Sequence, residues 1–159
     1  MAVLTDDMLQ LVAEQKLGYL ASVSAEGTPN LSPKGTFLVR DDDHIMFAEM
    51  RSPNTLANIE TTPNIEVNFV DIFSRKGFRF KGLARFIAKG TEEYEALLPP
   101  FLAEWGALSE LFNGIVVIKV ETALPLTSPA YDIGAEEAQL RQQWLDYFTK
   151  LQGRTTKGH

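Results

Sequence analysis

Six stretches of the chain have the pattern of a β-strand: several alternate apolar and polar residues, and the last, 115–128, is mostly apolar. The clearest is 76–90, in which Phe78, Phe80 and Phe86 share one parity while basic residues occupy the other. Such alternation is typical of an antiparallel strand with one buried face. Together the stretches predict strands over residues 17–24, 29–39, 44–50, 64–71, 76–90 and 115–128.

Four further segments have helical spacing or helix-start signals. Thr5 is a suitable N-cap for a short first helix, and Ser52 is one for a second helix that must end before Pro63. Thr91 opens a third segment, which Pro99–Pro100 divides. The last helix, expected over 135–151, has an apolar stripe made of Leu140, Trp144, Phe148 and Leu151.

The strands are too closely joined for the longer crossovers that parallel strands need. The pattern therefore predicts a mainly β (α+β) fold, a small closed antiparallel barrel of six strands with short flanking helices. The sequence contains no internal repeat and no low-complexity linker, so we expect one domain over residues 1–159, with 152–159 as a flexible tail.

Composition narrows the possible functions. The formal net charge of -6 argues against generic nucleic-acid binding, and the lack of cysteine excludes disulfides and thiolate chemistry. With only His44 and His159 as histidines, we expect no metal site. No apolar run approaches the roughly 20 residues that span a bilayer, and the first residues lack a signal-peptide pattern. We therefore expect a soluble cytoplasmic protein that binds no membrane.

The charges are unevenly distributed along the chain. Between Asp71 and Glu92 there is no acid, but six basic residues: Arg75, Lys76, Arg79, Lys81, Arg85 and Lys89. One interpretation is the solvated face of an antiparallel strand. The other is an electropositive groove that attracts an anionic ligand.

Two other stretches offer hydrogen-bonding groups in unusual places. "RSPNT" at 51–55 surrounds an expected helix start with donors, an arrangement that favours a phosphate, although Ser52 could simply cap the helix. "NLSPKGTF" at 30–37 places a lysine and a hydroxyl beside a proline within an expected strand. Read alone, Lys34 fits a surface lysine on an edge strand.

Taken in order, these motifs resemble a known family. "GTPNLSPKG" at 27–35, "RSPNTLANI" at 51–59, "TPNIEVNFVD" at 62–71 and "KGFRFKGLA" at 76–84 are similar to the pyridoxamine 5'-phosphate oxidase-like, FMN-binding split-barrel family. The resemblance covers about residues 16 to 90. It implies a six-stranded antiparallel split β-barrel.

The resemblance also implies a homodimer that holds FMN at its interface. The strand residues that would hold the flavin are Asn30, Leu31, Ser32, Pro33 and Lys34. Those that would meet its phosphate are Arg51, Ser52, Asn54 and Thr55, with Arg79 or Lys81 from the basic strand. The hydride chemistry belongs to the flavin. The resemblance thus implies an FMN-dependent oxidoreductase of a small-molecule substrate, with NAD(P)H as one candidate electron donor and no assigned catalytic residue.

The chain departs from the pyridoxamine phosphate oxidases themselves. Pro29 and Asn30 stand near where those enzymes have an arginine, and the segment 128–144 does not resemble their substrate-gripping tail. Oxidation of pyridoxamine phosphate is therefore not expected. Two alternatives are a split barrel that binds flavin, deazaflavin or haem without turnover, and a structural dimer whose basic face meets an acidic partner.

Overall fold

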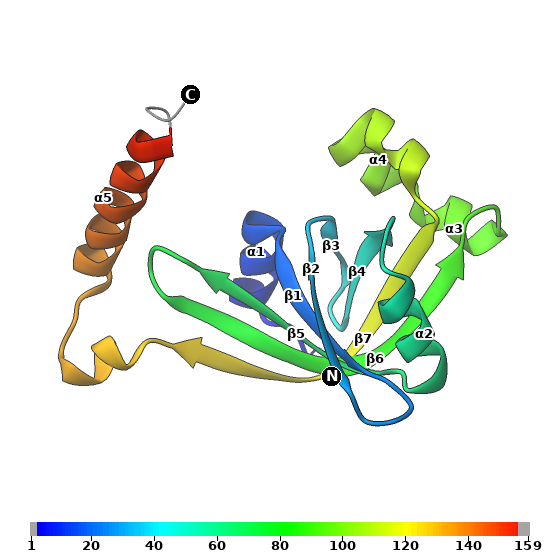
Figure 1. Cartoon of the computed structure of the whole chain (residues 1–159), viewed down its shortest axis with the longest axis horizontal. Coiled ribbons are helices and arrows are strands. Elements are labelled where there is room, and N and C mark those ends of the chain that lie inside the picture. Colours follow the sequence, from blue (N-terminus) through cyan, green and yellow to red (C-terminus); the bar gives the residue numbers. More distant parts are fainter. Residues whose placement is uncertain (1–2, 156–159) are drawn as a thin grey trace.

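The computed structural model describes residues 3–155 of the chain (Figure 1). Its strands are β1 Gly18–Val23, β2 Pro29–Lys34, β3 Phe37–Asp41, β4 His44–Glu49, β5 Asn64–Asp71, β6 Lys76–Ala88 and β7 Gly114–Thr127. Its helices are α1 Asp6–Gln15, α2 Pro53–Thr61, α3 Glu92–Leu97, α4 Pro99–Trp105 and α5 Glu137–Thr155, with 3-10 turns η1 Gly106–Leu111 and η2 Pro129–Ile133.

The strands form one antiparallel sheet in the order β2-β1-β5-β6-β7-β4-β3. The α+β class and the antiparallel arrangement are as predicted. The prediction of a closed barrel with six strands is wrong, because the sheet has seven strands and β2 does not pair with β3. The segment 29–39, predicted as one strand, contains both β2 and β3, and Gly35 and Thr36 interrupt it.

The two strands lie at opposite edges of the sheet although they are neighbours in sequence. From Lys34 to Phe37 the chain can span at most about 11 Å, so the edges must approach one another and the sheet must curl. Thr36 supports the approach, since its hydroxyl donates to the carbonyl of Ala48 (3.0 Å) and accepts from the N–H of Ala48 (3.1 Å). The result is a strongly curved sheet that stays open along β2.

Two apolar clusters lie on the two faces of this sheet. The inner one contains the rings of Phe37 and Phe69, whose centroids are 4.8 Å apart, and is covered by α1. The other lies beneath α3, α4 and η1, where Phe101 and Phe112 pack on the opposite face of β4 and β7. The first half of β7 is thus buried on both faces, which explains why 115–118 is a continuous apolar run.

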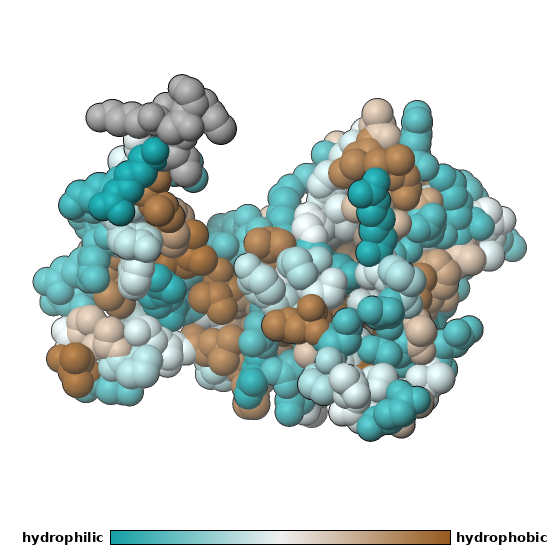
Figure 2. Space-filling view, viewed as in Figure 1, coloured by the Kyte–Doolittle hydropathy of each residue, from teal (hydrophilic) through white to brown (hydrophobic). Residues whose placement is uncertain are grey.

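The C-terminal segment stands apart from the sheet. Figure 1 shows β7 leading through η2 into α5, which rises beside the body of the molecule, and Figure 2 shows apolar surface along the side of α5 that faces the body. The helix extends to Thr155, beyond its predicted end at 151, and the rest of the expected tail lies outside the described residues. No helix within the described part of the chain is long and apolar enough to cross a bilayer.

Candidate functional site

Strand β2 carries five of the eleven predicted site residues and divides them between two faces. Pairing with β1 places Asn30 opposite Ser22, Ser32 opposite Leu20, and Lys34 opposite Gly18. Leu20 and Ser22 are fully buried, so these three β2 side chains lie on the inner face. Leu31 and Pro33 therefore lie on the outer face, opposite Ala21 and Tyr19.

The inner side chain of Asn30 on β2 meets the first turn of α2. The amide of Asn30 donates to the hydroxyls of Ser22 (3.3 Å) and Thr55 (3.4 Å). Asn58, also on α2, donates to the same Ser22 hydroxyl at 3.0 Å. A chain of hydrogen bonds thus connects β1, β2 and α2 and brings Asn30 into contact with Thr55.

Lys34 is the buried cation of the site, with 8% of its surface exposed. Its ammonium donates to the hydroxyl of Ser32 at 3.0 Å and lies 5.6 Å from the ring centroid of Phe47. Burial lowers the pKa of Lys34, and the nearby carboxylate of Glu49 opposes part of that change. A desolvated amine of this kind can donate a hydrogen bond or neutralise negative charge that develops beside it.

Glu49, at the end of β4, is only 2% exposed and faces the start of α2. Its Oε1 accepts from the backbone N–H of Ser52 (2.6 Å) and from the Ser52 hydroxyl (3.0 Å). Its Oε2 accepts from the side-chain amide of Asn113 at 3.1 Å. Ser52 does take the N-cap position, but its hydroxyl donates to Glu49 instead of accepting a bond from the helix.

The remaining donors of the α2 start are turned outward. Arg51 and Asn54 are both exposed. Arg51 also lines a hollow of about 580 Å³ together with Met50 and Leu111. These two side chains are accessible to an anion arriving from solution, unlike the Ser52 donors.

Arg79 and Lys81 do not join this group. Register across β1, β5 and β6 places them on the outer face, where Arg79 lies 2.8 Å and Lys81 3.5 Å from carboxylate oxygens of Glu66. Elsewhere in the basic run, Lys76 pairs with Glu137 and Arg85 pairs with Glu93. The basic residues therefore do not form one continuous cationic groove, because acids from other elements neutralise much of it.

Sequence reasoning missed Ser22, Glu49, Asn58 and Asn113. Two of them had a visible signal. Glu49 shares the inward parity of Ile45 and Phe47, and an acid at such a position is rarely buried without a partner. Ser22 likewise follows Leu20 in parity. The contributions of Asn58 and Asn113 depend on elements far apart in the sequence, and no local pattern marks them.

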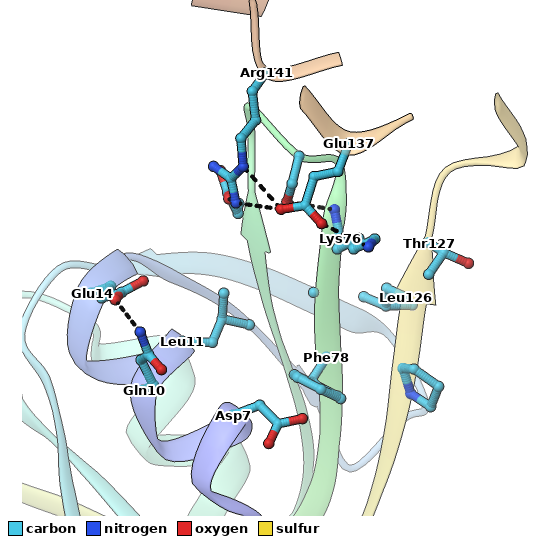
Figure 3. A pocket seen from close by; sticks show the side chains of 14 residues that line it. Asp7, Gln10, Leu11, Glu14, Lys76, Phe78, Leu126, Thr127, Glu137 and Arg141 are labelled. Atoms are coloured by element: carbon cyan, nitrogen blue, oxygen red, sulfur yellow. Dashed lines mark hydrogen bonds and ion pairs between the residues drawn. The ribbon is translucent and has the colours of Figure 1, made fainter. Parts of the chain in front are cut away.

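A second hollow, of about 440 Å³, lies between α1, the ends of β6 and β7, and α5 (Figure 3). Two salt bridges between α5 and the sheet form its outer wall. Glu137 pairs with Lys76 (2.8 Å), and Arg141 pairs with Asp71 (2.8 Å). Burial by itself would raise the pKa of Asp71. Hydrogen bonds from Phe73 and Ser74, with the charge of Arg141, outweigh burial and hold the pKa below its usual value.

The histidine in the described part of the chain is remote from β2 and α2. His44 begins β4 and Glu49 ends it, so the two lie about 17 Å apart along the strand. The Nδ1 of His44 is 2.7 Å from carboxylate oxygens of both Asp41 and Asp43. An imidazole at this position does not reach the polar cluster of the site.

Comparison with known proteins identifies the family. The family model for pyridoxamine 5'-phosphate oxidase matches residues 4–126. The chain belongs to this family. Its match extends well beyond the motifs at 16 to 90 and includes most of β7, so the resemblance inferred from sequence is confirmed.

Solved structures of similar fold carry different descriptions. HupZ from Group A Streptococcus is 31% identical, with 79% of this chain and 95% of that chain covered and a TM-score of 0.68. An FMN-binding protein from Syntrophomonas wolfei is 17% identical (76% and 84% covered, TM-score 0.62). HutZ, the heme storage protein of Vibrio cholerae, is 20% identical (78% and 94% covered, TM-score 0.62). No curated protein matches the sequence.

The residues of the site fit a flavin in part. As the terminal strand, β2 has one edge without a strand partner among residues 3–155, so backbone groups within 31–34 can bind the polar edge of a planar ring. Lys34 supplies a positive charge beside that edge, and Arg51 and Asn54 offer donors at the nearby start of α2. Ser52 fits a phosphate poorly, because Glu49 already takes both of its donors.

Proposed function

We propose that this protein binds FMN along the open edge of β2 and uses it as a small-molecule oxidoreductase of the cytoplasm, with NAD(P)H as the electron donor. The observation that carries the proposal is the position of Lys34. It is a buried cation in a member of the pyridoxamine 5'-phosphate oxidase family, on a strand that has no strand partner along one edge within residues 3–155 and whose Asn30 hydrogen-bonds to α2.

Each residue of the site has a distinct role in this proposal. The free backbone groups of 31–34 orient the ring, while Ser32 holds the Lys34 ammonium in place. Lys34 neutralises the negative charge that appears beside it on reduction. Asn30 and Thr55 fix β2 against α2. The exposed side chains of Arg51 and Asn54 bind the FMN phosphate from its solvent side. Flavin supplies the hydride chemistry when bound.

A homodimer with the cofactor at its interface is part of the proposal. The outer face of the sheet exposes the apolar side chains of Tyr19, Leu31 and Leu124. On the same face, Asn68 Oδ1 and Arg79 Nε are buried and have no hydrogen-bond partner among residues 3–155. Apolar surface together with unsatisfied polar atoms supports a second copy of the chain as the cover.

FMN binding is tested with purified protein and a pair of lysine variants. Lys34→Met removes the buried charge, and we expect FMN affinity to fall about tenfold or more, since a bond to a charged group is lost. The matched control is Lys89→Met, because Lys89 is exposed and donates to the carbonyl of Glu110. Wild-type protein that shows no visible flavin absorption after incubation with FMN would contradict the proposal. Equal affinities of the two variants would reject the role of Lys34.

A second candidate is a carrier that binds flavin, deazaflavin or haem without turnover. The observation that favours it is that the buried carboxylate of Glu49 opposes part of the lowering of the pKa of the buried Lys34, so the charge of Lys34 is partly balanced within the chain. Anaerobic addition of NAD(P)H to the flavin-loaded protein separates the two candidates. Bleaching of the visible flavin band supports the oxidoreductase, and an unchanged spectrum supports the carrier.

A further inference from the structure

The amino end of α2 already holds an anion that belongs to the chain. Glu49 accepts both the N–H and the hydroxyl of Ser52, at 2.6 and 3.0 Å. The unpaired N–H groups of a helix start and the side-chain donors around them are the groups that a phosphate would use. Glu49 therefore occupies donors that the family resemblance had assigned to the phosphate of the cofactor.

Asn113, which is far from Glu49 in the sequence, holds the Glu49 side chain in place. Asn113 donates its side-chain amide to Glu49 Oε2 at 3.1 Å and to the carbonyl of Met50 at 2.8 Å. The backbone N–H of Asn113 also donates to the Glu49 carbonyl at 2.8 Å. Such a carboxylate, almost fully buried and held by several donors, is a fixed part of the site and not a mobile surface group.

We propose that Glu49 is a specificity-determining residue that weakens the binding of phosphate at the start of α2. The inference rests on the proposed flavin site and deepens it. A phosphate monoester carries between one and two negative charges near neutral pH. At Ser52 it would compete with Glu49 for the same donors and would meet a like charge where water screens poorly.

The consequence concerns which part of a ligand supplies affinity. The flavin ring, bound along β2 and beside Lys34, supplies most of the binding affinity. A phosphate at the start of α2 adds little affinity. The wild-type protein therefore binds FMN and riboflavin with affinities within about threefold of each other. The ligands that suit this site are planar rings whose anionic groups lie away from Ser52.

The test compares FMN and riboflavin on one variant. Glu49→Gln keeps the size of the side chain and an oxygen for the Ser52 N–H but removes the charge. We expect FMN affinity to rise at least about tenfold, because the repulsion between two close charges at intermediate dielectric exceeds the free energy of a tenfold change, and riboflavin affinity to change less than twofold. A side chain that only supported the fold would change both affinities together.

Asp71→Asn is the matched control. Asp71 is also a buried carboxylate that accepts a backbone N–H, from Phe73 at 2.9 Å, and faces a cation, Arg141 at 2.8 Å. It lies at the β5–β6 turn, away from α2. We expect the ratio of FMN affinity to riboflavin affinity in Asp71→Asn to equal the ratio in the wild-type protein.

A second readout needs no flavin. Inorganic phosphate should raise the melting temperature of Glu49→Gln above that in chloride of equal ionic strength, and should not do so for wild type. If Glu49→Gln does not fold because Lys34 loses its partner, the double variant Lys34→Met/Glu49→Gln removes both buried charges and serves for the phosphate measurement.

The outcomes distinguish this inference from the proposed function. If flavins bind and the affinity ratio in Glu49→Gln equals that in wild type, the role of Glu49 is overturned. If no flavin binds to any of the proteins but phosphate stabilises the variant, the proposed function fails and the role of Glu49 stands. If neither flavin nor phosphate binds, both are overturned.

Discussion

On the inner face of the sheet, Lys34 is 8% exposed and lies near the buried carboxylate of Glu49, whereas on the outer face the Lys81 side chain is 55% exposed and lies 3.5 Å from Glu66. Both are lysines on strands of one curved sheet, and both have an acid nearby. On the inner face the neighbours are aromatic rings and helix α2. On the outer face they are polar side chains and, in our proposal, a second copy of the chain.

This difference shows that charge alone does not identify a binding site. The outer basic residues are the more conspicuous in the sequence, but acids on β5, α3 and α5 pair with several of them. Lys34 on the inner face is desolvated, and the carboxylate of Glu49 balances its charge only in part. A ligand therefore gains more from meeting Lys34 than from meeting another cation that is already paired.

The largest expected effect comes from the packing of the inner face. Phe80→Ala removes a fully buried ring, and we expect the free energy of unfolding to fall by about 3–5 kcal/mol. The matched change on the outer face, Leu124→Ala, affects a side chain that is 51% exposed and should cost less than about 1 kcal/mol in dilute protein. Urea unfolding of both variants measures this, and similar losses would contradict the assignment of the two faces.

The next effect concerns what covers the outer face. Tyr19→Glu places a charge on the apolar outer surface, and we expect the dimer to weaken about thirtyfold or more, as at a central interface residue. Tyr147→Glu is the control, since Tyr147 has nearly the same exposure (52% against 49%) but lies on α5. Sedimentation at several concentrations gives the subunit mass. A wild-type protein that stays monomeric at every concentration would contradict the proposal that a second copy of the chain covers the outer face.

A smaller effect is expected at the joint between the sheet and α5. Because its folded pKa is lowered, Asp71 stabilises the protein above the unfolded pKa of about 3.9, and this contribution is lost as pH falls through the lower folded pKa. Asp71→Asn should cost about 1–2 kcal/mol at neutral pH, the size of a lost charged hydrogen bond. Urea midpoints across an acid pH series should converge for the two proteins, and a constant difference would argue against the ionised form as the cause.

The smallest effect is expected at the outer ion pairs. Glu66→Gln removes the partner of Arg79 and Lys81, and since these groups are partly exposed we expect a loss below about 1 kcal/mol that shrinks further in salt. Unfolding measured at low and high ionic strength tests this. A larger loss that persists in salt would mean that the outer face is as desolvated as the inner one.

Much of the fold followed from local patterns in the sequence. Period-2 alternation located β1, β5 and β6 because each has one face on the inner core. The same pattern could not show that 29–39 contains two strands. Gly35 and Thr36 break the ladder only because β2 and β3 pair with different partners at opposite edges, and pairing partners are not a local property.

The candidate site was predictable to a similar extent. The ordered motifs identified the family and named Asn30 and Thr55, which hydrogen-bond to one another, and Lys34, which lies on the same inner face of β2. The motifs also named Arg79 and Lys81, which the register of the sheet sends to the other face. The parity of Glu49 was visible in the sequence, but its partners were not, because the donors that it binds, on Ser52 and Asn113, come together only in the folded chain.

By itself, the sequence determined the position of most strands, the family and several of the residue types that meet at β2 and α2, since alternation, turns and motifs are written in neighbouring residues. Only the tertiary structure decided which of those residues share a face, that the sheet stays open along β2, and that the start of α2 already holds a carboxylate. The physical reason is that burial and pairing of charges depend on contacts between segments far apart in the chain, such as β4 with the residue that precedes β7.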